Sequence, residues 1–226
     1  MNMAETKMPS AGITASTPDR VMLGAGVYAQ GLSIDEVPTP EQVLTGIIGA
    51  TNGGGKIEII PEFLDLEIDG KLVKTKGMVQ KVGETATMET NMAEIVPDMI
   101  TKMVVGTDIP DEEKKYHKVT SKAKLVEGDY YKGLGFVGQT LAGNPIIVVF
   151  KNALCTSGFS TEAKNKEQAV FTGTFECCAD TDAITQGGNL ETLPYAIWIY
   201  DEKLGQMEQA NIQTVAAQEA KAQEEK

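Results

Sequence analysis

Glycine-rich spacings are the first features of this chain that could do chemistry. Gly133, Gly135 and Gly138 have the spacing of a dinucleotide-binding turn, but such a turn lies between a strand and a helix, and here strand-like sequence continues on both sides. Residues 50–57 resemble a phosphate-binding loop, yet alanine replaces its first glycine and isoleucine its metal-binding Ser or Thr. We interpret the first segment as a strand with glycines at bends or close backbone contacts, and the second as a plain loop.

Side chains that could act as nucleophiles, bases or metal ligands are few. His117 is the only histidine, so no multi-histidine metal site can form, and the three cysteines lack Cys-x-x-Cys spacing. Cys177 and Cys178 are adjacent in an apparent strand, where neighbouring side chains rarely form a disulfide, so core packing is the better interpretation. The sequence predicts no catalytic, cofactor-binding or metal-binding residue, and we expect no enzyme.

The charge balance excludes a protein that grips nucleic acid. The chain has 20 basic and 32 acidic residues and a net charge of -12. Binding to phosphates needs a basic surface that displaces their counterions. DNA near this protein would be repelled.

Targeting signals are not evident. The longest apolar run, Ile146–Phe150, is far shorter than the roughly 20 residues of a membrane span. Residues 1–12 are polar and lack the apolar core of a signal peptide. We expect a soluble protein with no membrane partner, synthesised in a cytoplasm.

Strand signals dominate the chain. In Leu64–Asp69 apolar residues alternate with Asp65, Glu67 and Asp69, which predicts a strand with one buried and one solvated face. Asp69-Gly70 predicts a type I′ turn, with a return strand over Leu72–Lys81. Further strands are expected over Arg20–Tyr28, Glu84–Thr90, Tyr130–Leu141, Ile146–Phe150, Ala169–Cys178 and Tyr195–Tyr200.

One convincing helix lies within Met92–Val105. Asn91 could cap it, but Pro97 fits only a first turn, which moves the expected start towards Val96. Four apolar residues share one face of it: Ile95, Met99, Ile100 and Met103. Packing of this face against a sheet is favoured over binding to a partner.

The remaining segments divide the chain into an arm, one β domain and a tail. We expect an extended N-terminal arm over residues 1–19, a β domain over 20–205 and a flexible or helical tail over 206–226. Within the domain the expectations are a short helix or turn at Pro40–Ile48, a loop at Asn52–Gly55 and a long charged surface loop at Gly106–Asp129.

Several ordered blocks resemble the major tail tube proteins of long-tailed bacteriophages (siphophages). The strongest is Gly49–Gly70, with its Gly-Ala-Thr-Asn-Gly-Gly turn, its Pro61-Glu62 pair and its final Glu-Ile-Asp-Gly. The other blocks are Arg20–Tyr28, Lys74–Met78, Glu89–Ile95, Asn144–Ala153 and Leu193–Trp198. Together they cover roughly residues 20–202, and it is their order and spacing that carries the resemblance.

The resemblance implies a β-sandwich or barrel with one flanking helix. It implies subunits that form hexameric rings, with hairpins joined into one barrel around a lumen and with rings stacked head to tail. It implies the partners of such a tube: tape measure protein, tail terminator and distal tail proteins, and DNA passing through without specific binding. The expected location is the virion tail, with no cofactor.

Asp65, Glu67 and Asp69 are the candidate residues facing that lumen, where acidic groups would repel DNA and let it slide. An outer, solvent-facing position is equally open, because alternation defines faces but not their surroundings. Trp198 could anchor an interface or pack in the core.

Three other identities remain open. One is the tube of a contractile phage tail or of a phage-derived bacteriocin. Another is a soluble enzyme or ligand-binding β protein using the segment near Gly133. The third is a decoration or capsid-associated protein.

Overall fold

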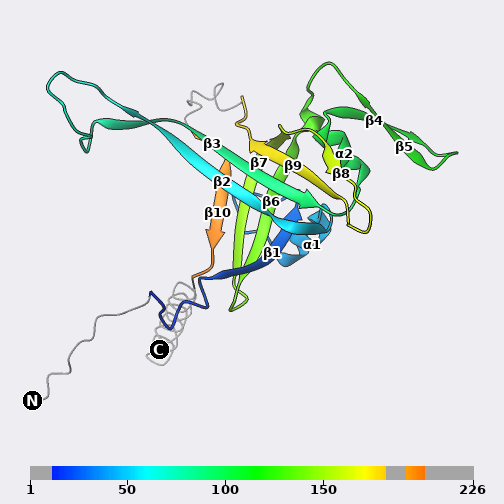
Figure 1. Ribbon diagram of the computed structural model, residues 1–226, viewed down its shortest axis with the longest axis horizontal. Helices are drawn as coiled ribbons and strands as arrows, with labels where there is room; N and C mark the ends of the chain where they lie inside the picture. Colours follow the sequence, from blue (N-terminus) through cyan, green and yellow to red (C-terminus); the bar gives the residue numbers. More distant parts are fainter. Residues whose placement is uncertain (1–11, 182–191, 202–226) are drawn as a thin grey trace, which may run out of the picture.

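The computed structural model of the chain describes residues 12–181 and 192–201 and is mainly β (Figure 1). Its strands are β1 (Met22–Ala29), β2 (Thr51–Asp65), β3 (Val79–Met92), β4 (Gly106–Asp111), β5 (Tyr116–Ser121), β6 (Tyr131–Thr140), β7 (Pro145–Cys155), β8 (Ser160–Glu162), β9 (Val170–Cys177) and β10 (Tyr195–Ile199). Its helices are α1 (Pro40–Gly46) and α2 (Pro97–Met103), with one 3-10 turn at Glu127–Asp129. The predicted mainly-β class is confirmed, and a second helix, α1, forms where a helix or a turn was expected.

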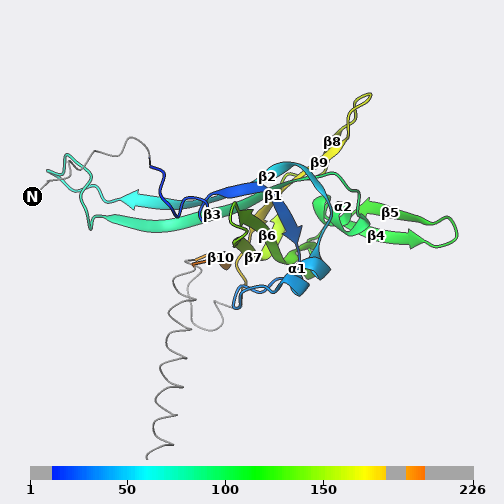
Figure 2. The ribbon, with the colours of Figure 1, turned by 90° about the horizontal axis from the view of Figure 1, so that it is seen from below.

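One antiparallel sheet holds eight of the described strands. Its main order is β1-β6-β7-β9-β3-β2, and β8 pairs with β9. The second edge of β7 is shared, because Ile146–Phe150 pair with β10 and Ala153–Cys155 pair with β9. β4 and β5 form a separate hairpin, which projects from the opposite end of the molecule to the long β2–β3 hairpin (Figures 1 and 2).

The sheet buries apolar side chains on both of its faces, since alternate residues of a strand point to opposite sides. Met99 and Met103 of α2 belong to the larger cluster, together with Tyr28, Met88, Met92, Tyr131, Phe136, Phe150, Phe171 and Phe175. The smaller cluster holds Ala29, Leu32, Ile147 and Val149, with Val43 of α1 and Trp198 packed against it. This position favours the core interpretation of Trp198.

Helix α2 begins at Pro97, close to the predicted start at Val96. The predicted cap is wrong: Val96 is the N-cap residue and no side chain caps the helix. Asn91 lies on β3 instead, where its amide donates to the Gly54 carbonyl at 3.2 Å and its carbonyl accepts from the Thr172 hydroxyl at 2.8 Å. The residue therefore ties three strands together.

The two outer strands of the main order, β1 and β2, approach each other near Tyr28. The Tyr28 hydroxyl donates to the Glu89 carbonyl at 3.1 Å. A Cβ added at Gly55 would lie 1.8 Å from that hydroxyl oxygen. The sheet thus curls towards a barrel at this end, and glycine at 55 leaves the room for it.

The loop expected at Asn52–Gly55 is wrong, because these residues belong to β2. The pairing with β3 shifts register between Thr51 and Gly55. Gly53 and Gly54 have φ of +88° and +73°, a conformation that glycine adopts readily. The glycines therefore form a bulge inside a strand rather than a break between elements.

Two further expectations about β structure are wrong. The strands expected at Leu72–Lys81 and Glu84–Thr90 are one strand, β3, which begins only at Val79. The charged loop expected at Gly106–Asp129 contains the β4–β5 hairpin. These strands are polar and pair through backbone hydrogen bonds. The sequence therefore lacks the apolar alternation that would have predicted this hairpin.

The ends of the expected domain plan are only partly described. Residues 15–20 form turns and a bend, with Thr17 N–H donating to Thr14 O at 3.0 Å and Arg20 N–H to Thr17 O at 3.1 Å. The first part of the expected N-terminal arm and the expected tail over 206–226 lie outside the described residues. Among the described residues, no helix is long and apolar enough to cross a membrane.

Candidate functional site

The projecting hairpin, defined as residues 60–85, is the feature that sets this molecule apart from a closed β domain. β3 pairs with β9 only over Thr87–Met92. Beyond that point β2 and β3 pair only with each other, out to Asp65 and Val79. They leave the body as a two-stranded ribbon (Figures 1 and 2), and among the described strands both of its edges are unpaired.

Apolar side chains are exposed along this ribbon. Eight large ones are exposed: Ile60, Phe63, Leu64, Leu66, Ile68, Leu72, Val73 and Val82. Phe63 is 57% exposed and Leu72 95%. A bulge at Val82, where Glu62 pairs with Gly83 and Phe63 with Lys81, interrupts the alternation. An isolated two-stranded ribbon is at best marginally stable in water, so this surface is suited to being covered.

The expected half-buried strand over Leu64–Asp69 is wrong. β2 ends at Asp65, and the segment from there to Met78 is a connection closed by Leu66 N–H donating to Met78 O at 2.9 Å. Leu64, Leu66 and Ile68 of that pattern are all exposed. Alternation predicted a buried face for these three side chains, but none of the described residues covers them.

The Asp69-Gly70 turn forms, but not as type I′. Lys71 N–H donates to Ile68 O at 2.9 Å, which closes a four-residue turn. Gly70 has φ of +87°, whereas Asp69 is not among the described residues with positive φ. A type I′ turn needs positive φ at both positions, so the strand does not return at once and a longer connection follows.

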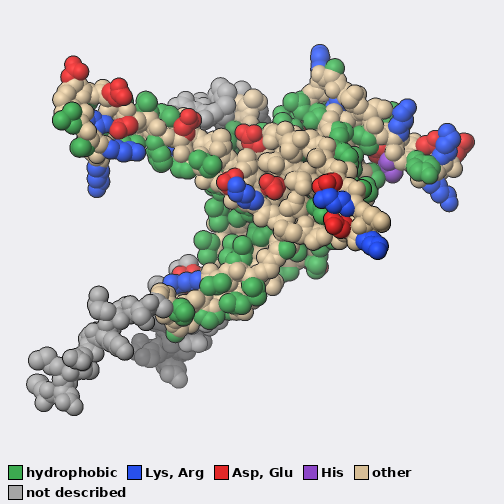
Figure 3. Space-filling view, in the orientation of Figure 1, with side chains coloured by type: hydrophobic (Ala, Val, Ile, Leu, Met, Phe, Trp, Pro, Cys, Tyr) green, Lys and Arg blue, Asp and Glu red, His purple; other side chains and the backbone are tan. Residues whose placement is uncertain are grey.

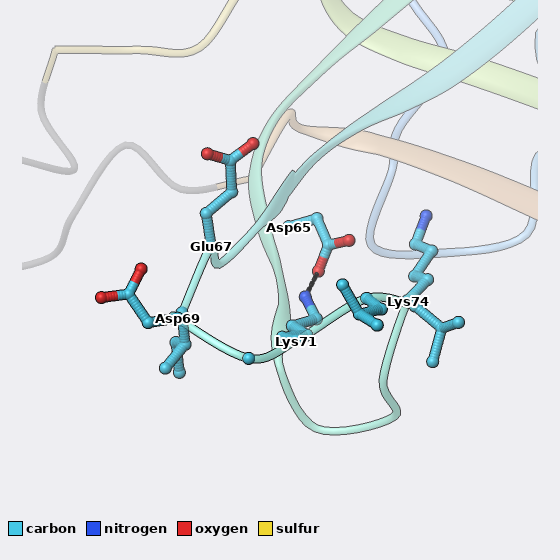
Figure 4. A pocket seen from close by; sticks show the side chains of 9 residues that line it. Asp65, Glu67, Asp69, Lys71 and Lys74 are labelled. Atoms are coloured by element: carbon cyan, nitrogen blue, oxygen red, sulfur yellow. Dashed lines mark hydrogen bonds and ion pairs between the residues drawn. The ribbon is translucent and has the colours of Figure 1, made fainter.

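The three predicted lumen residues lie together at the tip, around a surface recess of about 620 Å³ (Figure 4). Lys71 turns towards Asp65 and pairs with it, and it also donates to Leu66 O at 2.8 Å. Glu67 and Asp69 project away from this pair (Figure 4). One of the three carboxylates is therefore neutralised within the hairpin and two are not.

Over residues 60–83 the charges of the hairpin are separated between its two limbs, and Glu84 follows at the root. The outgoing limb (residues 60–70) contains Glu62, Asp65, Glu67 and Asp69 and no Lys or Arg. The returning limb (residues 71–83) contains Lys71, Lys74, Lys76 and Lys81 and no Asp or Glu. Red and blue groups accordingly gather on different sides of the projecting end in Figure 3. The tip is charge-balanced, not a uniformly acidic surface.

Glu84 anchors the root of the hairpin to the body. Its side chain is 6% exposed and pairs with Lys81. It also accepts a hydrogen bond from Leu193 N–H at 2.7 Å, just before β10. The Leu193 N–H and Lys81 hold the pKa of the Glu84 carboxyl below its usual range.

The glycines of the Gly133–Gly138 segment serve packing. They lie within β6, and strand β7 rather than a helix follows. A Cβ at Gly133 would lie 2.0 Å from the Leu32 carbonyl oxygen, and one at Gly135 would lie 2.6 Å from Leu32 Cδ1. Leu32 N–H donates to Gly133 O at 3.0 Å. The interpretation of close backbone contacts is confirmed.

A polar recess of about 410 Å³ does lie beside Gly133. Its two lysines are each engaged: Lys132 pairs with Glu127 at 2.8 Å and Lys151 with Asp180 at 2.7 Å. An anionic ligand would have to compete with these carboxylates. The recess therefore gives little support to a nucleotide site.

The histidine and the buried cysteines lie on different sheets. His117 lies on β5 and contacts Asp108 through Nδ1 at 2.7 Å. Cys155 and Cys177 are buried on β7 and β9. Burial raises the pKa of the Cys177 thiol to about 12, which keeps it in the less nucleophilic thiol form. Within the described residues, no group of three His, Cys, Asp or Glu side chains could hold a metal ion.

A second apolar surface was not anticipated from the sequence. A groove of about 740 Å³ runs beside the edge strand β1 and is lined by Leu23 and Val27 of β1, Val43 and Leu44 of α1, and Val37. Its residues come from segments that are distant in the sequence and meet only in the fold. A short apolar stretch such as residues 21–27 predicts a strand but not a groove.

Compared with the known protein families, the sequence matches none of them. No curated protein matches it either.

Proposed function

We propose that this protein is the subunit of a bacteriophage tail tube, assembling into stacked hexameric rings around a channel for DNA. The observation that carries the proposal is the projecting hairpin, an apolar ribbon whose two edges and exposed side chains the described part of the chain leaves uncovered. Pairing of several such ribbons into a barrel would remove those edges, which otherwise invite open-ended association. The order of the sequence blocks that resemble siphophage tube proteins supports the same conclusion.

The two apolar surfaces suit a ring. The hairpin extends from β2 and β3, and the groove lies beside β1, at the other end of the main strand order. A contact between unlike surfaces is heterologous, and it closes into a ring or continues into a filament. In a tube of stacked rings, one heterologous contact closes each ring and another continues the filament from ring to ring.

Passage of DNA without binding is consistent with the charge. The chain carries a net charge of -12, which opposes contact with phosphates. The tip contributes little to that excess, because its lysines match its carboxylates in number. The prediction that Asp65, Glu67 and Asp69 face the lumen stands as a prediction, with Glu67 and Asp69 the two that have no ion-pair partner among the described residues.

Tape measure, terminator and distal tail proteins would be the partners of such a tube, and the virion tail its location. A contractile tail or bacteriocin tube would use the same ring, and a sheath bound to the outside would distinguish it. A capsid decoration protein would fractionate with heads and not with tails.

Negative-stain electron microscopy of the purified protein across concentration and salt tests the proposal. We expect rings or hollow tubes of uniform diameter. The double variant Phe63→Ser/Leu72→Ser should raise the protein concentration needed for assembly by roughly tenfold or more, since each buried apolar side chain contributes about 1.5–3 kcal/mol. Its thermal unfolding should match the parent, because both side chains are exposed in the monomer. A parent that stays monomeric under every condition refutes the proposal.

A further inference from the structure

The separation of charge along the projecting hairpin goes beyond what an apolar contact needs. Every Asp and Glu of residues 60–83 precedes Lys71, and every Lys or Arg follows Gly70. The chain reverses between them: residues 60–65 of the outgoing limb pair with residues 79–85, and the connection over residues 66–78 continues both limbs to the turn. One edge of the ribbon is therefore acidic and the other basic.

Part of this charge is already neutralised inside the subunit. Lys71 pairs with Asp65 across the limbs, and Lys81 pairs with Glu84 at the root. The described residues offer no ion-pair partner to Glu62, Glu67 or Asp69 on the outgoing limb. They offer none to Lys74 or Lys76 on the returning limb. All five of these side chains are exposed.

The unpaired charges near the tip lie at similar distances along the chain from the turn, on its two sides. Glu67 and Asp69 lie just before the turn at Gly70, and Lys74 and Lys76 lie shortly after it. Figure 4 shows Glu67 and Asp69 on one side of the tip and Lys74 on the other. A second hairpin placed alongside, pointing the same way, would bring its returning limb next to the outgoing limb of the first. That arrangement continues the antiparallel alternation of strands.

We propose that this polarity makes the association of hairpins directional: the acidic outgoing limb of one copy binds the basic returning limb of a second copy. The inference rests on the proposed function and adds what decides which side of one subunit contacts its neighbour. Opposite charges that face each other across a contact stabilise it, and like charges oppose it. Two copies related by a two-fold axis would set like limbs together, so that dimer is disfavoured and the heterologous contact is selected. Such complementarity acts mainly on specificity.

Charge reversal tests the inference. The acidic-limb variant is Glu67→Lys/Asp69→Lys, and the basic-limb variant is Lys74→Glu/Lys76→Glu. Each alone gives the same sign to the charges at positions 67, 69, 74 and 76, and we expect the concentration needed for rings or tubes to rise by about tenfold or more at low salt. An equal mixture of the two variants should assemble, because a hairpin with four basic residues at positions 67, 69, 74 and 76 can alternate with one that has four acidic residues there. The variant with all four substitutions reverses the sign of the charge at each of these positions, so that the outgoing side of the tip is basic and the returning side acidic. It should assemble alone, like the parent.

A matched control separates pairing from net charge. Lys118→Glu/Lys124→Glu makes the same charge change as the basic-limb variant at exposed residues outside the hairpin and should assemble like the parent. In about 1 M salt, where the Debye length is about 3 Å, the defect of the reversed variants should shrink. Thermal unfolding of every variant, compared with that of the parent, shows that each one folds.

The outcomes are distinguishable. If the parent forms rings or tubes and either reversed variant assembles equally well, the inference is wrong and the proposed function stands. If the control loses assembly as much as the basic-limb variant, net charge and not the limb pairing is responsible, and the inference is again wrong. A parent that never assembles refutes both.

Discussion

Substitution of Gly55 by alanine is the sharpest test of how the sheet closes. A Cβ at this position would lie 1.8 Å from the Tyr28 hydroxyl oxygen and 2.4 Å from the Glu89 carbonyl oxygen. Tyr28 is fully buried, and burial raises the pKa of its hydroxyl to about 12. The ring must therefore move, and its hydrogen bond to Glu89 must lengthen or break.

The magnitude follows from three contributions. Overpacking a buried site costs about 1–3 kcal/mol, and loss of a hydrogen bond adds about 1 kcal/mol. Reduced freedom of the unfolded chain offsets about 0.4–1 kcal/mol. The expected net loss in free energy of unfolding is about 2–3 kcal/mol. For a domain of this size, that lowers Tm by roughly 5–10 °C.

Thermal and urea unfolding of the monomer provide the assay, with Gly128→Ala as the matched control. No atom lies within 4 Å of a Cβ at Gly128, and its φ is not positive, so this variant should unfold within about 0.5 kcal/mol of the parent. In a double-mutant cycle, Tyr28→Phe should recover part of the loss, because it removes the atom nearest to the new methyl group. If Gly55→Ala unfolds like the parent, the approach of β1 to β2 is wrong.

Two further substitutions test the anchoring of the hairpin and of helix α2. Glu84→Gln should lower the free energy of unfolding at pH 7 by about 1 kcal/mol or more, since it weakens a hydrogen bond to a charged group. Because the pKa of Glu84 is lowered in the folded state, its contribution is present above the unfolded pKa near 4.5 and disappears as pH falls through the folded value. Denaturant unfolding at a series of pH values should show the gap between variant and parent closing on acidification; a gap that widens contradicts the assignment. Met103→Ala should cost about 2–5 kcal/mol in urea unfolding because the side chain is 1% exposed, whereas Ile95→Ala, at 68% exposed, should cost less than about 0.5 kcal/mol. Equal effects of these two would show that α2 does not pack as described.

The helix illustrates how far periodicity can be trusted. Ile95 and Met103 share one face of the predicted helix, but the helix starts only at Pro97. Pro97 carried that information in the sequence, since proline fits a first turn. Ile95 therefore lies outside the helix and outside the core, and only the residues after the proline could be assigned to the core from the pattern.

The charged segment after α2 shows the opposite limit. Residues 106–121 have few apolar residues and were expected to be a loop, yet they pair as β4 and β5. Backbone hydrogen bonds hold such a hairpin, and the backbone is the same in every sequence. A hairpin that does not bury one face leaves no alternation to detect.

By itself the sequence determined the mainly-β class, the strands that build both core clusters, and the ordering of charge from the acidic residues 60–70 to the basic residues 71–83. These depend on local composition and spacing, which are the same whatever the chain folds against. Only the tertiary structure decided that β3 leaves β9 at Thr87 and carries β2 away from the body. The exposure of Leu64, Leu66 and Ile68 follows from that departure. Alternation states which side chains share a face, but burial depends on the distant strands that arrive to cover it, and here none of the described strands do.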